Sequence, residues 1–350
     1  MPTSIDADPP SSRGMPIDAP ARNRPNLLIR FGLALFAGVL AGALAAYTEV
    51  LTGPPGSDYR VVWSAGRAVL DRVDPYGVAA SGLVPVLADR FFYPLPAALF
   101  GMPFAWLPVS LAAVCFAAAS GALFMFAMTG DGFERVPVVL SIPFIFASKI
   151  SQTTPLIVGL ALIPALSGLA LLKPNLGIPL FSRAPRLGPI IVCGVLLLAT
   201  WALFPTWPLH WLETVRSSTV HRAPMLTSIG AVGLLAATRW RRPEGRLLLL
   251  MTVIPHGAAF YDELPLWLVA TTRREAMFLT FASWVGCLFW LALGDGRFMR
   301  SAPWSTAFLY VPATAIVLRR PNVGSIPEWL ERLVSGWPRR LRGETHATPA

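Results

Sequence analysis

The strongest constraint on this fold is a series of long apolar segments separated by short loops that carry arginine. The first segment runs from residue 27 to 47, about the twenty residues that an α-helix needs to cross a bilayer. Further apolar runs occupy residues 91–108, 110–128, 136–148, 154–181, 187–205, 225–238, 247–260, 263–271, 276–293 and 302–318. This pattern predicts an all-α protein that crosses a membrane many times.

The composition excludes a water-soluble chain. Of the 350 residues, 54% are apolar and only 14% are charged, whereas soluble domains carry roughly 25% charged residues. The net charge of +10 comes mainly from arginines between the apolar runs, which favours contact with membrane lipids over nucleic-acid binding. The three cysteines lie in apolar runs without metal-ligand spacing. We therefore expect no metal site, no cofactor and no nucleic-acid partner.

Several of the apolar runs are too short for a perpendicular span or are interrupted by proline. Broken helices persist in a membrane only where other helices or a wet cavity satisfy the freed backbone groups. The sequence therefore predicts a bundle of about 10–12 transmembrane helices arranged around a cavity.

The chain divides into three predicted regions. Residues 1–26 are rich in Pro, Ser, Asp and Arg and lack periodicity, which indicates a disordered cytoplasmic tail. Residues 27–320 form the transmembrane domain, in which residues 52–90 are the first outer loop. Residues 321–350 combine tryptophan and leucine with arginine, which is typical of a basic amphipathic tail on the cytoplasmic surface.

The arginines also predict the orientation. Arg22, Arg24 and Arg30 precede the first span and indicate a cytoplasmic N-terminus. If residues 154–181 and 247–271 each cross twice, all later arginine clusters lie inside as well, and there are about twelve crossings with both ends cytoplasmic. These clusters are Arg183/Arg186, Arg239/Arg241/Arg242/Arg246, Arg273/Arg274 and Arg319/Arg320. We expect a multi-pass protein of the inner or plasma membrane.

The first outer loop contains the most informative stretch, SDYRVVWSAGRAVLDRVDPYG at residues 57–77. Its apolar and polar side chains separate onto two faces at helical spacing, which predicts an amphipathic helix lying in the interface. Asp58 stands at the start of this helix, directly after the first span. It is either a helix N-cap or a general base at the membrane surface, and the two roles are compatible.

The same loop resembles a known family, because an Asp after the first span, a Trp-Ser-Ala-Gly helix and a closing Asp-Pro-Tyr occur in order. Four further segments, again in order, resemble motifs of the same family: FFYPLP (91–96), SQTTPLIVGL (151–160), LLKPNLGIPL (171–180) and IPHGAAFYD (254–262). Together they cover most of residues 50–265. The family is glycosyltransferase family 87, whose members have the GT-C fold and use polyprenyl-phosphate sugars as donors. Ser151 stands where the family usually has glycine, and Thr153-Thr154 stand near its usual asparagine.

The resemblance implies a mannosyltransferase or arabinofuranosyltransferase that works at the outer face of the membrane. The donor would be a polyprenyl-phosphate-linked sugar, mannose before arabinofuranose, and the acceptor a lipid or a glycan. Asp58 would take the proton of the acceptor hydroxyl. Cationic or N–H donors would stabilise the leaving phosphate.

Two cationic candidates for the phosphate lie in apolar runs. Lys173 is one of only two lysines, and it is either a phosphate ligand or a lysine snorkelling at the end of a span. His256 is either a second ligand or a buried packing residue. Arg216 and His221, in the outer loop 205–224, are either phosphate ligands or solvated loop residues. Tyr93 and Asp262 are expected to line the cavity, with Asp262 binding sugar hydroxyls.

Two other classes of function remain open. A lipid or solute transporter, or a flippase, would also need a central polar cavity, but the sequence shows no internal repeat of the kind transporters carry. A catalytically silent membrane scaffold is the third possibility. Hydrolase, metalloprotease and dinucleotide-binding motifs are absent from the sequence.

Overall fold

The computed structural model describes residues 25–52, 58–76, 91–216, 222–257, 259–294 and 301–324. These residues form helices and turns, and the only β-type pairing among them is an isolated bridge between Arg222 and His256. The predicted all-α class is therefore confirmed. Both predicted tails lie almost wholly outside the described residues.

Three helices are long and apolar enough to cross a membrane: α1 (Leu27–Thr52), α4 (Val109–Met128) and α12 (Arg273–Leu293). Two further candidates are sharply bent pairs, α5 (Ile142–Lys149) with α6 (Thr154–Leu162), and α9 (Leu187–Leu203) with α10 (Trp207–Arg216). The described residues thus contain three to five candidate spans by length and composition. The larger predicted number of 10–12 crossings stays a prediction.

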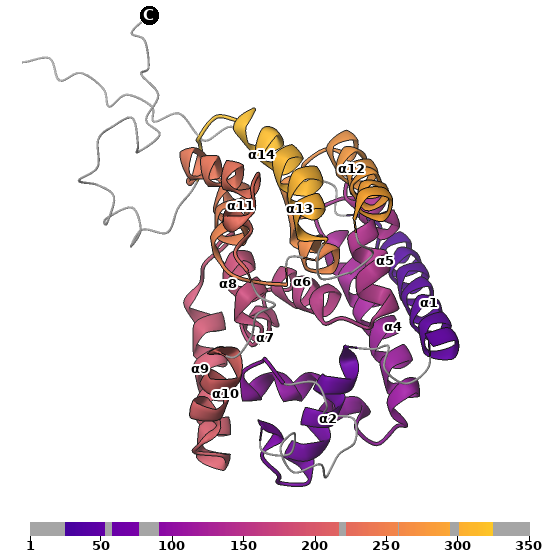
Figure 1. Cartoon of the computed structure of the whole chain (residues 1–350), viewed down its shortest axis with the longest axis vertical. Coiled ribbons are helices and arrows are strands. Elements are labelled where there is room, and N and C mark those ends of the chain that lie inside the picture. Colours follow the sequence, from indigo (N-terminus) through magenta and orange to yellow (C-terminus); the bar gives the residue numbers. More distant parts are fainter. Residues whose placement is uncertain are drawn as a thin grey trace, which may run out of the picture.

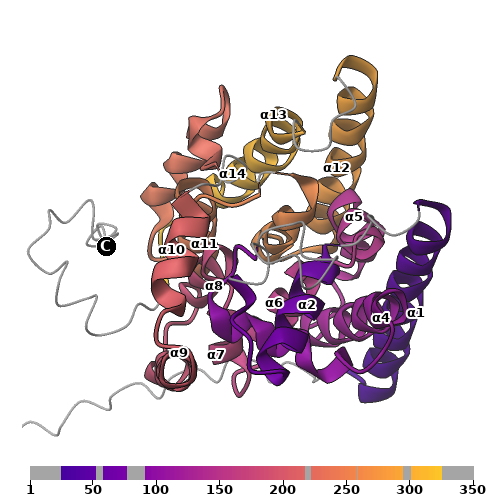
Figure 2. The same cartoon turned by 60° about the horizontal axis from the view of Figure 1, so that its bottom comes forward.

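The remaining predicted runs form shorter helices, as proline and short apolar stretches suggested. They are α7 (Ser167–Ala170), α8 (Pro174–Phe181), η4 (Pro224–Leu226), η5 (Gly230–Arg239), α11 (Pro243–Val253), η6 (Phe260–Val269), α13 (Ala302–Ser305), η8 (Thr306–Tyr310) and α14 (Val311–Leu318). Figures 1 and 2 show these pieces gathered between α1, α4 and α12 on one side and α9 on the other.

Small residues allow α1 and α4 to pack closely along their length. A Cβ added at Gly38 would lie 2.9 Å from Ala118 O, and one added at Gly121 would lie 2.8 Å from Ala41 Cβ. Close backbone approach of this kind is the usual way in which helices associate in lipid. The opposite face of α1 is covered with exposed Leu, Phe and Val side chains, and so are the outer faces of α9 and α12. These apolar faces are suited to contact with lipid.

Residues 91–108 do not form the span that their hydropathy suggested. Four prolines break the segment into two short 3₁₀ helices, η1 (Leu95–Phe100) and η2 (Met102–Phe104). These helices pack beside α2 (Tyr59–Leu70), at the bottom of Figure 1. The segment thus packs against α2 instead of crossing the bundle.

The amphipathic helix predicted after the first span is present as α2, and the protein buries its apolar face together with Arg60 and Ser64 of its polar face, whereas Arg67 and Asp71 stay exposed. Arg60 forms an ion pair with Glu49 at the end of α1 and is only 8% exposed. Trp63 Nε1 donates to Phe104 O at 3.1 Å, and Tyr59 stacks on Phe116 of α4. The helix is therefore fixed between α1, α4 and η2.

Residues of two predicted arginine clusters, Arg239 and Arg320, lie together with Arg135 at the end of the bundle opposite α2. Arg135 and Arg320 donate to the neighbouring carbonyls of Ala270 and Val269, and Arg239 donates to Arg320 O. In Figure 1 this end, with the starts of α11 and α12 and the end of α14, is at the top, and α2 is at the bottom. Several arginines therefore lie at the end of the molecule opposite α2.

Candidate functional site

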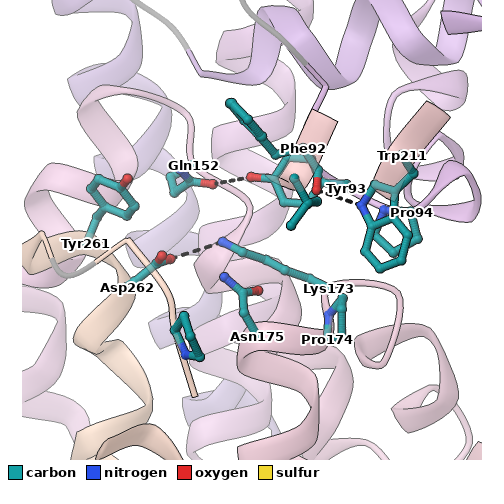
Figure 3. Close-up of a pocket in the computed structure, with 12 residues that line it drawn as sticks. Phe92, Tyr93, Pro94, Gln152, Lys173, Pro174, Asn175, Trp211, Tyr261 and Asp262 are labelled. Carbon is teal, nitrogen blue, oxygen red and sulfur yellow. Dashed lines mark hydrogen bonds and ion pairs between the residues drawn. The ribbon is translucent and has the colours of Figure 1, made fainter. Parts of the chain in front are cut away.

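A pocket of about 200 Å³ opens between segments that are far apart in the sequence. Figure 3 shows its lining converging from the turn before α6, the start of α8, α10 and the start of η6. The lining residues are Phe92, Tyr93, Pro94, Gln152, Lys173, Pro174, Asn175, Trp211, Val215, Pro255, Tyr261 and Asp262. Three of the predicted site residues, Tyr93, Lys173 and Asp262, therefore share one cavity.

Asp58 stands beside this pocket through its contact with Gln152. It occupies the N-cap position of α2, yet its side chain makes no capping hydrogen bond. Instead, Gln152 Nε2 donates to Asp58 Oδ2 at 2.8 Å, and the backbone N–H of Asp58 donates to Ile150 O at 2.9 Å. The exposed carboxylate is thus directed at the α5–α6 turn, and the geometry does not support the side-chain capping interpretation.

Gln152 is held by contacts that fix the direction of its amide. Its Oε1 accepts hydrogen bonds from Thr153 N at 2.7 Å and Thr153 Oγ1 at 3.0 Å, and from Tyr93 Oη at 3.3 Å. With the carbonyl oxygen so occupied, the NH₂ group faces Asp58. Gln152 therefore connects the carboxylate of the first outer loop to the pocket wall.

The turn that presents Gln152 has an unusual backbone. Ser151 has φ +49°, in the left-handed region that glycine adopts most easily, and its buried Oγ has no hydrogen-bond partner among the described residues. The turn thus places a non-glycine residue in a conformation that glycine adopts most easily.

Tyr93 is positioned by the segment that follows α2. Tyr76 Oη donates to Tyr93 O at 2.6 Å, and burial raises the pKa of Tyr76, which keeps the phenol protonated as a donor. The Tyr93 ring lies 5.6 Å from Lys173 Nζ, within range of a cation–π contact. Tyr93 therefore contacts both the Gln152 turn and the lysine.

Lys173 is buried and paired in this structure. Its Nζ donates to Asp262 Oδ1 at 3.0 Å and to Thr154 Oγ1 at 3.3 Å, and Thr154 donates to the same Asp262 oxygen at 2.6 Å. Only 2% of each charged residue is exposed, so the snorkelling interpretation of Lys173 is wrong. Two of the three ammonium donors are used, and the side chain borders the pocket.

His256, predicted to be either a phosphate ligand or a buried packing residue, is not among the residues that line the pocket. It is fully buried, with Nδ1 2.9 Å from Ile254 O and Nε2 3.1 Å from Tyr310 Oη. Glu263, next to Asp262, lies 3.6 Å from Nε2. Tyr310 is carried by the π-helical turn η8, a type of irregularity often found at functional sites. The histidine thus belongs to a buried cluster with Glu263 of η6 and Tyr310 of η8.

The loop predicted to supply further cations contributes other residues instead. Trp211 of α10 lines the pocket and donates from Nε1 to Phe92 O at 3.0 Å, and His210 contacts Asp74 at 2.7 Å. Arg216 ends α10 with an exposed side chain and is not among the lining residues. His221 lies outside the described residues.

Several residues of this region were not predicted as site residues. They are Gln152, Thr154, Asn175, Glu263 and Tyr310. Gln152, Thr154 and Asn175 lie inside the motifs that resemble glycosyltransferase family 87, so their polar character within apolar runs was the available signal. Glu263 was a second signal, because a carboxylate in an apolar run needs a buried partner.

Comparisons with protein-family models, curated proteins and solved structures find no match. The resemblance to glycosyltransferase family 87 therefore depends on the sequence motifs alone. Chemically, the arrangement offers a cavity with a buried ammonium and an aromatic wall, and an exposed carboxylate beside it that contacts the lining residue Gln152.

Proposed function

We propose that this protein is a membrane glycosyltransferase that moves a sugar from a polyprenyl-phosphate donor to a lipid or glycan acceptor. We expect mannose as the sugar, with arabinofuranose as the alternative, and a site facing the outside of the cell membrane. The observation that carries the proposal is the hydrogen bond between Asp58 and Gln152, which joins a carboxylate to the pocket that Lys173 borders. The five ordered motifs support the same assignment.

In the proposed reaction, Asp58 removes the proton from the acceptor hydroxyl as its oxygen bonds to the anomeric carbon of the sugar. The bond from that carbon to the phosphate oxygen breaks on the opposite face, so the configuration inverts. The polyprenyl phosphate leaves with the electron pair. Asp58 is suited to the proton transfer because its carboxylate is exposed and is held by Gln152 in one direction.

Lys173 would stabilise the charge that develops on the leaving phosphate. Its ammonium lies in a poorly solvated wall, where an electrostatic contact is stronger than in water. Asp262 compensates this charge in the absence of substrate. Tyr93 and Trp211 supply aromatic surface for the sugar and the first part of the lipid.

The arginine-rich end supports the proposed orientation. Cytoplasmic loops are enriched in arginine, and here Arg135, Arg239 and Arg320 lie together at the end opposite α2. A site at the outer face would receive its lipid donor sideways from the bilayer.

The decisive experiment compares Asp58→Asn with Asp71→Asn in membranes supplied with radiolabelled polyprenyl-phosphate mannose. Asp71 is the matched control, because it caps the other end of α2 and pairs with exposed Arg67. Transfer of label to endogenous lipid or glycan should fall about 10²- to 10⁴-fold in Asp58→Asn and persist in Asp71→Asn. Undiminished transfer would remove Asp58 as the base. Movement of labelled lipid across the membrane without transfer would favour a transporter.

A further inference from the structure

A second pocket lies at the arginine-rich end of the molecule. It has a volume of about 190 Å³ and is bordered by the ends of α6 and α8 and by the start of α9. Its charged lining consists of Arg183, Arg186 and Asp131. Two guanidinium groups against one carboxylate leave the pocket with a net positive charge.

Arg183 has an unsatisfied buried guanidinium atom. Its Nε is buried without a hydrogen-bond partner, and no carboxylate in the described residues lies within ion-pair distance of Arg183 or Arg186. Burial, followed by the positive charge of nearby Arg135, lowers the pKa of Arg183 to about 10. An anion in the pocket would relieve both effects.

Neighbouring Arg246 shows how a purely structural arginine looks in this protein. Its guanidinium donates to four backbone carbonyls, those of Ser182, Arg183, Trp240 and Arg241. Arg183 lacks such a set of acceptors, although it is in the same region of the fold. Arg183 instead lines the pocket.

The start of α9 adds to the positive potential. Arg186 is its N-cap residue, its side chain makes no cap, and the first turn contains no acidic residue. The N-terminal end of a helix favours anions through its dipole and its free N–H groups. Exposed Leu187 and Ile190 follow directly on the apolar outer face of α9, so lipid would lie next to the pocket.

We infer that this pocket binds a phosphate group, of the kind that an anionic phospholipid headgroup presents at the cytoplasmic surface. Arg183 and Arg186 would donate to the phosphate oxygens, and Leu180 and Phe181 would contact the glycerol and upper acyl chain. The inference does not depend on sugar transfer, because the pocket is at the other end of the molecule.

The test uses the full chain purified from nanodiscs of phosphatidylcholine with phosphatidylglycerol, and native mass spectrometry counts the retained lipids. Arg183→Gln is compared with Arg183→Lys, which keeps the charge, and with Arg274→Gln, which removes an exposed arginine that does not line the pocket. Retention of phosphatidylglycerol should fall about tenfold in Arg183→Gln, less in Arg183→Lys and not in Arg274→Gln. The Tm of each variant checks that it folds.

A second arm separates the two sources of phosphate. Inorganic phosphate is added to the protein in phosphatidylcholine alone, and thermal unfolding is followed. If inorganic phosphate stabilises the original chain but not Arg183→Gln, and phosphatidylglycerol is not retained, the lipid headgroup is excluded and the ligand is free phosphate. If Arg183→Gln and Arg274→Gln behave alike in both arms, the inference is overturned.

Discussion

Gln152 donates a 2.8 Å hydrogen bond to Asp58 across 94 residues of sequence, and this contact joins the first outer loop to the pocket. The Asp58 backbone is fixed separately by Ile150. Gln152 therefore orients the Asp58 carboxylate. The position of α2 does not depend on Gln152, because the Asp58 backbone has its own hydrogen bond.

Gln152→Leu should lower transfer about 10- to 100-fold while the Tm changes little, because small displacements of a reacting group are costly. Gln152→Glu should give a different result, since it sets a second carboxylate against Asp58. Two adjacent carboxylates resist being ionised together, so the acidic limb of the pH–activity profile should move to higher pH. An unshifted profile in active Gln152→Glu would show that Asp58 is not the titrating base.

Variants of the Lys173–Asp262 pair can distinguish a structural role of Lys173 from a role in sugar transfer. Lys173→Met alone should destabilise the fold by about 3–5 kcal/mol, because it leaves a buried carboxylate without its partner. The double variant Lys173→Met/Asp262→Leu should recover much of the Tm, since both charges are then gone. Transfer should remain low in both variants. Recovery of activity together with stability would show that the lysine acts only in folding.

The sequence was sufficient for the class of fold and for three residues of the site. Hydropathy predicted α1, α4 and α12, because uninterrupted apolar runs of about twenty residues admit few other structures. Tyr93, Lys173 and Asp262 were predicted from motifs and do share a pocket. Residues 91–108 were misassigned because hydropathy does not register that four prolines prevent a continuous helix.

The contacts of His256 and Arg60 could not be predicted either, because sequence patterns do not show which distant residues pack together. Periodicity tells which residues share a face of a helix, but it does not tell what covers that face. Arg60 was assigned to the polar side of an interfacial helix, and in the structure it reaches Glu49 inside the protein. His256 likewise faces Tyr310, 54 residues further along the chain. Both depend on tertiary packing.

The backbone of Ser151 allows a stabilising substitution. Ser151→Gly should raise the stability by about 1 kcal/mol, because glycine accepts the left-handed conformation and the unpartnered hydroxyl is removed. Transfer should be kept, since Gln152 stays in place. Ser151→Val should do the reverse, as a β-branched side chain is poorly tolerated at this φ. Thermal unfolding of the two variants tests the geometry, and equal Tm values would contradict it.

Two glycines dock α2 onto η1 and hence position Asp58. A Cβ at Gly101 would lie 2.1 Å from Val62 O, and one at Gly66 would lie 2.7 Å from Gly101 C. Gly101→Ala should therefore push α2 away and reduce both Tm and transfer. Gly32→Ala is the matched control, because nothing lies within 4 Å of its added Cβ in α1. It should be neutral or slightly stabilising, and a similar loss in both variants would argue against specific docking.

The buried cluster of His256, Glu263 and Tyr310 should affect turnover rather than donor binding. None of the three lines the pocket, but Glu263 adjoins Asp262, which does. Tyr310→Phe removes a hydroxyl that contacts His256 Nε2 and should cost about 1 kcal/mol of stability. With η6 less firmly held, kcat should fall in Tyr310→Phe and in His256→Gln while KM for the donor stays near its original value. Lys173→Met provides the comparison, because loss of a contact to the donor phosphate should raise the donor KM as well as lower kcat. If His256→Gln raises the donor KM as much as Lys173→Met does, the histidine meets the ligand directly and the pocket must extend behind η6.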